Sequence, residues 1–353
     1  PKSGAFAKDG HYFGFKEGFF DIGNWPSSFF TGMALLAFES TGDAFYLDQV
    51  NRLKSAYREK ITAHRMDTMH DLGFLYTLYA KAMFKLTGDP EHRQMALHAA
   101  DELARRFIPN GGYLRAWGRM DEAGTAYEGL AIIDSLMNLP LLFWAAKENG
   151  TPVLHHIAGR HADTMLARLV RRDGSVFHSF RFDPATGAPR QAENYCGFGV
   201  DSQWARGMTW AIYGFALAYR HTRDAVYLDA ALRIAHKFIG QLDEEVVPVW
   251  DFRLPPAAEK LRDSSAAAIA ACAFDELLHH RPGEKALGDA ADRLLGRLCS
   301  EVYLDADPAC PGILRFGEVG DGVGKARTAY TSWGDYYFME ALTRRLHGTE
   351  SYW

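Results

Sequence analysis

The feature of this 353-residue chain that most constrains its fold is the alternation of two kinds of helical segment. In the first kind, apolar residues recur at helical spacing between charged residues, as on a helix that covers a surface. The second kind is poor in charge and rich in aromatic and small residues, as in a helix enclosed on most sides. The surface segments are 43–63, 90–107, 154–169, 225–239 and 284–298, and the enclosed segments are 26–39, 71–86, 135–147, 202–221, 264–280 and 332–346.

A weak repeat marks the points where an enclosed segment passes into a surface segment. TGDAFYLDQV begins at Thr41, TGDPEHRQMA at Thr87 and TRDAVYLDAA at Thr222, with RPGEKALGDA at Arg281 as a looser copy. Two helices per unit, with a period of roughly 45 to 65 residues, indicate an array of helical hairpins. Such an array is either an open solenoid or a closed toroid. A closed ring of six hairpins needs one more surface helix, which we expect to precede Pro1.

The enclosed segments share unusual residues at their N-terminal ends. Inner helices of a hairpin array run in the same direction, so these ends should gather on one rim. A pocket lined by helix N-termini has a positive field, which favours an anionic ligand. The openings read WPSSFF from Trp25, HDLGF from His70, IIDSLMN around Asp134, DSQWARG from Asp201, DSSAA from Asp263 and SWGDYY from Ser332.

Two explanations apply to these ends. Aspartate and serine at N-caps satisfy free N–H groups in any helix, which would account for Asp201 and Asp263. Capping does not account for tryptophans, and their number near one rim favours stacking against a sugar. The tryptophans concerned are Trp25, Trp117, Trp204, Trp210 and Trp333.

Two charged residues at the rim are also open to more than one interpretation. Arg206 could bind a ligand carboxylate in bidentate fashion, or it could pair with Asp201 or another acid. Asp134 follows two isoleucines in the apolar stretch AIIDSLMNLPLLFWAA. Burial of a carboxylate costs several kcal/mol unless it is paired, hydrogen-bonded or protonated. Asp134 is therefore either a helix cap, a member of a buried ion pair, or an acid whose proton is used.

Taken together, the motifs resemble glycoside hydrolase family 88, the unsaturated glucuronyl hydrolases. WPSSFFTGM, HDLGF, IIDSLMNLPLLFWA, DSQWARGMTWAIYGFA and WGDYYFMEAL occur in the family's order and separation over nearly the whole chain. The resemblance implies an all-α fold, an (α/α)6 barrel, with residues 1–353 forming a single catalytic domain. It also implies an enzyme that releases the 4,5-unsaturated uronic acid left by polysaccharide lyases at the non-reducing end of oligosaccharides.

The resemblance assigns roles to particular residues. It implies that Asp134 is the general acid and base and that Asp71 is the second essential carboxylate. It implies no cofactor and no metal. The uronate site would be lined by Trp25, Phe29, His70, Trp117, His178, Trp204, Arg206 and Trp210.

The chain departs from the family pattern in two places. Cys196 stands where the family commonly has a glutamine before WARG, and the loop GEVGDGVGKARTAYTS lacks a serine-rich pattern. Both departures concern the leaving sugar and its sulfation. The related family 105, which acts on unsaturated galacturonyl-rhamnose, is the alternative within this fold.

Cleavage of an unsaturated uronate can be catalysed by a single acidic group in apolar surroundings. A proton delivered to C4 generates oxocarbenium character at C5, water adds there, and the resulting hemiketal collapses with loss of the leaving sugar. A carboxyl group that donates this proton near neutral pH needs a raised pKa, which apolar surroundings and the charge of Asp71 would provide. Two other hypotheses remain: inverting hydrolysis of a saturated glycoside, and a non-catalytic helical toroid that binds sugar or protein.

Composition excludes several other classes. The net charge of −5, without a basic stripe, argues against nucleic acid, and no apolar run is long enough to span a membrane. The four cysteines lack metal-ligand spacing and fit a reducing compartment. We expect a cytoplasmic monomer or homodimer; a periplasmic location stays open because the sequence starts at Pro1 without a methionine. VFHSFRF from Val176 predicts a short strand, followed by a turn at DPATGAP.

Overall fold

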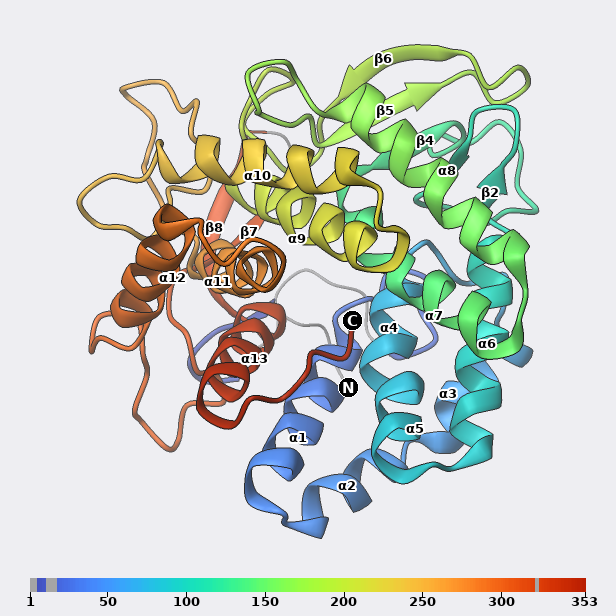
Figure 1. Cartoon of the computed structure of the whole chain (residues 1–353), viewed down its shortest axis with the longest axis horizontal. Coiled ribbons are helices and arrows are strands. Elements are labelled where there is room, and N and C mark those ends of the chain that lie inside the picture. The colour runs from blue at the N-terminus through green and yellow to red at the C-terminus, as the bar shows by residue number, and fades with distance from the viewer. Residues whose placement is uncertain (1–4, 11–17, 321–323) are drawn as a thin grey trace.

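In the computed structural model, which describes residues 5–10, 18–320 and 324–353, the enclosed segments form the inner wall of a closed ring (Figure 1). Each inner segment packs against the next one along the chain, and α13 packs back onto α1. The structure thus favours the closed toroid over the open solenoid. The inner segments are α1 (Ser27–Thr41), α4 with η1 and α5 (Leu72–Tyr76, Thr77–Lys81 and Ala82–Thr87), η2 with α7 (Ile133–Asn138 and Leu139–Asn149), α9 (Ala205–Thr222), α11 (Ser264–His280) and α13 (Ser332–His347).

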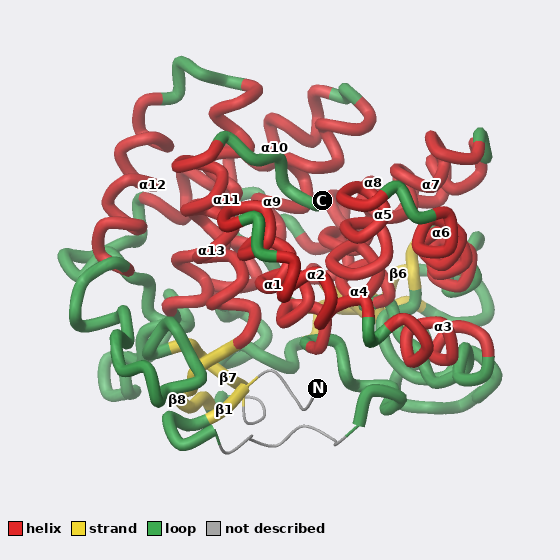
Figure 2. The backbone as a smooth tube through the Cα atoms, turned by 90° about the horizontal axis from the view of Figure 1, so that it is seen from below, coloured by secondary structure: helices red, strands yellow, loops and turns green. Residues whose placement is uncertain are grey.

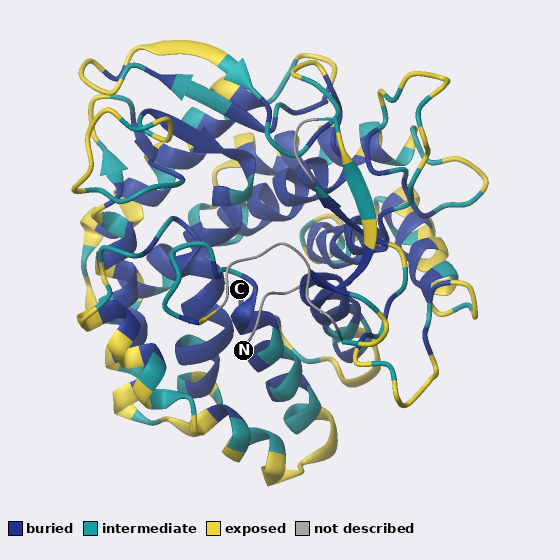
Figure 3. Cartoon of the chain, turned by 180° about the vertical axis from the view of Figure 1, so that it is seen from behind, coloured by how far each residue is buried: buried dark blue, intermediate teal, exposed yellow. Residues whose placement is uncertain are grey.

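The surface segments lie outside this ring, each against the inner helix that precedes it. Burial follows the predicted division, because the inner wall is buried while exposed residues gather at the periphery (Figure 3). One surface segment differs from the prediction: 43–63 is divided into two helices at Arg52 and Leu53. The outer helices are α2 (Ala44–Asn51), α3 (Lys54–Thr62), α6 (Pro90–Ala104), α8 (Pro152–Leu169), α10 (Ala225–Ile239) and α12 (Lys285–Leu298).

The weak repeat in the sequence is a corner between an inner and an outer helix. Asp43 caps α2 by accepting from the N–H of Phe45, and Asp89 and Asp224 cap α6 and α10 in the same way. The residue before each of these three aspartates has φ of +60° to +70° and ends the inner helix. Glycine adopts this conformation without strain, and TRD in place of TGD puts Arg223 there. The Thr-Gly-Asp repeat therefore encodes a helix stop, a turn and a helix start.

Eight short strands lie in the connections of the described chain, mainly toward one end of the ring (Figure 2). The predicted strand near Val176 is confirmed as β5, and the predicted turn follows it. The sheets are β1–β8–β7, β2–β3 and β4–β5–β6. The strands are β1 (Ala5–Phe6), β2 (Phe107–Ile108), β3 (Tyr113–Leu114), β4 (Leu130–Ile132), β5 (Ser179–Phe182), β6 (Pro189–Glu193), β7 (Gly317–Gly320) and β8 (Ala326–Thr331). Residues 321–323 of the sequence stretch GEVGDGVG, between β7 and β8, lie outside the described part.

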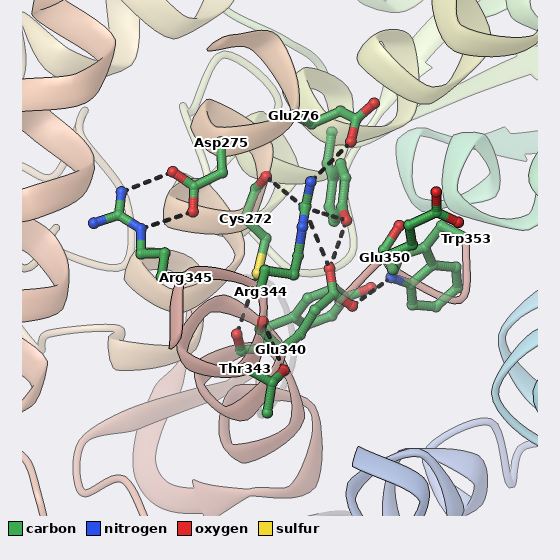
Figure 4. Close-up of polar contacts among 12 residues, drawn as sticks. Cys272, Asp275, Glu276, Glu340, Thr343, Arg344, Arg345, Glu350 and Trp353 are labelled. Atoms are coloured by element: carbon green, nitrogen blue, oxygen red, sulfur yellow. Dashed lines mark hydrogen bonds and ion pairs between the residues drawn. The ribbon is translucent and has the colours of Figure 1, made fainter. Parts of the chain in front are cut away.

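The far end of the ring, where the inner helices terminate, is closed by the segment 351–353. Trp353 stacks on Tyr337. Its indole N–H donates to Glu340 (Figure 4). Glu340 also accepts from Tyr336 and lies 3.8 Å from the Arg344 guanidinium. A cavity of about 890 Å³ lies at this end, and its charged residues are mostly engaged with each other.

Candidate active site

A cavity of about 290 Å³ lies where the inner segments begin. Five of the six predicted N-terminal openings contribute residues to its wall, which confirms that these ends gather on one rim. The sixth, the start of α11, reaches it through an ion pair described below. The wall consists of Gly23, Trp25, Met69, His70, Asp71, Phe74, Trp117, Ile132, Asp134, His178, Cys196, Trp204, Arg206, Val319, Gly320 and Trp333.

Asp134 is positioned by a strand and not, as the sequence predicted, by the first turn of an α-helix. Residues 130–132 form β4, the next six form the 3₁₀ turn η2, and α7 begins only at Leu139. Pairing of β4 with β5 sets Ile132 opposite Ser179, and the N–H of Ile133 donates to the carbonyl of His178 at 2.9 Å. This pairing brings Asp134 beside the His178 side chain. The β-branched isoleucines explain why the stretch starts as a strand.

Asp71 occupies the N-cap position of α4, on the neighbouring inner segment. Its surroundings depend on a close approach between α4 and η2. A Cβ at Gly73 would lie 2.3 Å from the Cα of Asn138, so only glycine fits there. Asn138 then accepts from the N–H of Phe74 at 2.7 Å and contributes a hydrogen bond to the Asp71 carboxyl. The contact joins the two segments that carry the two aspartates.

Each of the two aspartates faces the Nε2 atom of a histidine. A hydrogen bond to the Nδ1 atom of that histidine determines its tautomer. The N–H of Tyr195 donates to His178 Nδ1 at 3.0 Å, so the neutral ring carries its hydrogen on Nε2, 3.8 Å from Asp134 Oδ2. Asn138 Nδ2 lies 3.3 Å from His70 Nδ1, which puts the hydrogen of His70 on Nε2, 3.5 Å from Asp71 Oδ1. Both Nε2 atoms and Asp134 Oδ2 are buried and lack a hydrogen-bond partner among the described residues. They are available to a bound molecule.

Burial dominates the protonation states of these groups. It raises the pKa of Asp134 to about 7, although the charge of Arg206 and a backbone hydrogen bond oppose the shift. Burial and the negative charge of Asp134 raise the pKa of Asp71 to about 8, against the effects of Asn138 and Arg106. Since repulsion acts on both carboxyls, the two titrate as a pair that keeps a proton near neutral pH. Burial lowers the pKa of His178 to about 3, so this ring is neutral.

Arg206 forms ion pairs with Asp263 and Glu318, and not with Asp201. Its Nη1 atom lies 2.6 Å from Asp263 Oδ2 and 2.9 Å from Glu318 Oε2, and it also donates to the carbonyl of Glu318. The guanidinium lies over the rings of Trp204 and Trp333. These polar contacts all use Nη1, which leaves the remainder of the guanidinium toward the cavity that it lines. The capping interpretation holds for Asp263, which caps α11, and is wrong for Asp201, because Trp204 is the N-cap of α9.

Most of the residues predicted for the site meet in the cavity, and two do not. Trp25, His70, Trp117, His178, Trp204 and Arg206 line it with the two aspartates. Phe29 and Trp210 are fully buried one layer below, each packed against Phe74, which lines the floor. They follow the rim residues by about one helical turn, so the expectation that they line the wall is corrected: they support its floor.

Three residues of strand β7 that belong to the site were not singled out in the sequence. Val319 and Gly320 come from strand β7, and Glu318 just before them binds Arg206. A glutamate in a glycine-rich stretch gives no periodic signal. Only the pairing of β7 with β8, which leads into α13, brings it to the rim. Cys196 lines the cavity as well, and burial raises the pKa of its thiol.

The described residues contain neither a candidate metal site nor a candidate membrane-spanning helix. Three or more His, Cys, Asp or Glu side chains in an arrangement that could hold a metal ion do not occur there. None of the helices in this part of the chain combines the length and apolar character needed to cross a bilayer.

Known proteins that are similar to this chain share one family. The sequence model of Glycosyl Hydrolase Family 88 matches residues 16–278. An unsaturated glucuronyl hydrolase from Bacillus sp. (strain GL1) is 37% identical over 337 residues, which cover 94% of this chain and 89% of that protein. An unsaturated chondroitin disaccharide hydrolase from Streptococcus pyogenes serotype M1 is 36% identical over 340 residues, covering 94% and 84%.

A solved structure extends the similarity to three dimensions. The crystal structure of the Bacillus sp. GL1 unsaturated glucuronyl hydrolase, described as responsible for the degradation of glycosaminoglycan, superposes with a TM-score of 0.91 at 35% identity. The superposition covers 100% of this chain and 93% of that one. With the family model matching most of the chain and relatives above 30% identity over nearly all of it, this chain belongs to glycoside hydrolase family 88.

Proposed function

We propose that this member of family 88 is an unsaturated glucuronyl hydrolase in which Asp134 is the general acid and base and Asp71 is the second catalytic carboxyl. The observation that carries the proposal is the pair of buried carboxyls with raised pKa values, each facing a histidine Nε2–H, inside a cavity walled by tryptophans. A non-catalytic sugar-binding toroid has no need of two buried carboxyls that share a proton. We infer further that the closed ring is an (α/α)6 barrel and that residues 1–353 form one domain.

Asp134 can deliver its proton to C4 of the unsaturated uronate because apolar surroundings keep it protonated near neutral pH. As positive character develops at C5, the carboxylate left on Asp134 takes a proton from the water that adds there. The Nε2–H of His178 lies beside this carboxylate and can donate to it once the charge forms. The hemiketal then collapses and releases the leaving sugar. The proton balance closes, because Asp134 gives one proton and receives one.

The substrate class is proposed from the relatives and from the cavity. Proteins of this family named for glucuronyl and chondroitin disaccharide substrates are similar over nearly the whole chain. Trp25, Trp117 and Trp333 line the cavity, where an aromatic ring can pack against a sugar, and Arg206 offers a guanidinium to the sugar carboxylate. A family 105 type activity on unsaturated galacturonyl-rhamnose is the second candidate within this fold.

The proposed activity is tested with a panel of unsaturated disaccharides made by lyases from chondroitin, hyaluronan, heparin, gellan, xanthan and pectin. At least one should lose the ultraviolet absorbance of its conjugated alkene in step with release of the second sugar. A saturated glucuronide of the same shape should be a poor substrate, because it has no alkene to protonate. If all members keep their absorbance, or if saturated and unsaturated compounds are cleaved equally, the proposal is wrong. Cleavage of the pectin-derived compound alone would favour the family 105 type activity.

A further inference from the structure

The charges around the cavity pose a problem for an anionic ligand. Arg206 is the one lysine or arginine among the described residues that line it. Two carboxyls, Asp263 and Glu318, already contact its Nη1 atom. If both were ionised, the group would carry a net charge of about −1 before a uronate carboxylate arrived, and burial would leave that charge poorly screened. One of the two carboxyls must be neutral for Arg206 to attract an anion.

Asp263 accepts hydrogen bonds on both of its carboxyl oxygens. Its Oδ1 atom accepts from the N–H groups of Ser265 and Ala266, from the Ser265 hydroxyl and from the N–H of Glu318. Asp263 is also the N-cap of α11, where the helix dipole favours a negative charge. Its other oxygen faces Arg206 at 2.6 Å. Donors to both oxygens stabilise the carboxylate form.

Glu318 lacks this support. Its Oε2 atom accepts from Trp204 Nε1 at 3.3 Å and faces Arg206 Nη1, but its Oε1 atom has no partner among the described residues. The side chain is fully buried on β7. Oε1 lies on the side of Gly320, since a Cβ placed there would be 3.8 Å from it, and Gly320 lines the cavity.

We propose that Glu318 holds a proton whenever an anionic sugar occupies the cavity, and that this proton lets Arg206 accept the sugar carboxylate. Glu318 is then a residue that positions charge for binding; it acts through Arg206, and it is not a catalytic residue. The inference rests on the proposed function, because it takes the ligand to be a uronate. Binding above neutral pH would take up a proton from solvent onto Glu318, with no other bond made or broken.

The groups that face Glu318 agree with this assignment. Arg206 of α9 favours its ionised form, whereas burial and the charge of Asp263 oppose it. The net effect raises the pKa of Glu318 to about 7. Cys196 lies near it as a neutral thiol, since burial and the nearby carboxyls raise its pKa. Strand β8 places Thr328, which is uncharged, opposite Glu318.

The proton can be counted by titration calorimetry. The Asp134→Asn variant should bind the unsaturated chondroitin disaccharide without turning it over, and heats measured in buffers of different ionisation enthalpy give the protons taken up. Above about pH 8 the Asp134→Asn variant should take up about one more proton than Asp134→Asn/Glu318→Gln, because glutamine cannot ionise. The double variant should keep its affinity as pH rises from about 6 to about 8.5, whereas Asp134→Asn should weaken by up to about 10-fold per pH unit. Asp134→Asn/Glu340→Gln is the matched control, since Glu340 is equally buried at the far end, and its proton count should equal that of Asp134→Asn.

Equal proton counts with and without Glu318→Gln would overturn the proposal, as would loss of affinity in the Glu318→Gln variant at all pH values. If Glu318→Gln does not fold, Asp71→Asn/Asp134→Asn removes the other two cavity carboxyls, and uptake of about one proton above about pH 8 should persist. Its absence would contradict the role of Glu318. Failure of the proposed function looks different, because wild-type enzyme would then leave the alkene absorbance of every panel member unchanged.

Discussion

Asp134→Asn is expected to lower kcat by about 10²-fold or more while KM changes little, because the amide keeps the shape of the carboxyl but cannot supply a proton. Steady-state kinetics on the unsaturated disaccharide, followed by alkene absorbance, gives both constants.

The fold should be retained in the Asp134→Asn variant. Between the ordinary carboxyl pKa and about 7, the native state binds a proton that the unfolded state has lost, so stability falls as pH rises through this range. The Asp134→Asn variant has no such carboxyl and does not lose this stability as pH rises. At about pH 8 its unfolding temperature should therefore equal or exceed that of the wild type.

The matched control is Asp335→Asn. Asp335 is also a buried aspartate near a helix start, with its pKa raised by burial to about 7, but it lies outside the cavity and accepts from the N–H groups of Ile313 and Leu314. This variant should lose stability because an amide nitrogen would face one of those donors, and its kcat should stay within about twofold. If Asp134→Asn keeps most of its activity, or loses stability as Asp335→Asn does, then Asp134 is structural.

Asp71→Asn is the second large effect that we expect, with a loss of kcat/KM of about 10²-fold and a change in the pH profile. In the wild type the two carboxyls share a last proton, so Asp134 stays partly protonated until about pH 8. Without the charge of Asp71, the proton of Asp134 is lost around pH 7, the value to which burial raises its pKa. The alkaline limb of the residual activity should therefore move to lower pH by up to about one unit.

A profile of kcat/KM between about pH 5 and pH 9 measures this shift. His70→Gln is a useful companion, because it alters the polar group that faces Asp71 Oδ1 without removing the second carboxyl. It should keep the alkaline limb of the wild type. An alkaline limb that is the same in Asp71→Asn and wild type would show that the two aspartates do not share a proton.

The ring and its rim could be predicted because both depend on local patterns. Periodicity distinguished inner from outer helices, and the Thr-Gly-Asp corners determined where each pair turns. The common direction of the inner helices predicts that Trp25, Asp71 and Trp204 lie together, and all three line the cavity. These inferences need only neighbours in sequence and the geometry of a hairpin array.

The parts that could not be predicted depend on contacts between distant residues. Asp134 lies after a strand because β4 pairs with β5, about fifty residues away in sequence, and this pairing overrides the helical pattern. Glu318 reaches Arg206 across more than a hundred residues. Trp210 was predicted to line the wall because it follows Trp204 at the start of the same helix. It lies more than one helical turn after Trp204, which places it under Phe74.

The central claim is that Asp134 protonates C4 of an unsaturated uronate and that water adds at C5. The most direct measurement is the position of solvent isotopes in the product. Turnover in heavy water should place a single deuterium at C4 of the released uronate, and turnover in oxygen-labelled water should place the label on C5 of a trapped early product. In the Asp134→Asn variant, neither deuterium at C4 nor labelled oxygen at C5 should appear at the rate seen in the wild type. A label at C1, with no deuterium at C4 and the alkene retained in the first product, would contradict the account and establish ordinary glycoside hydrolysis.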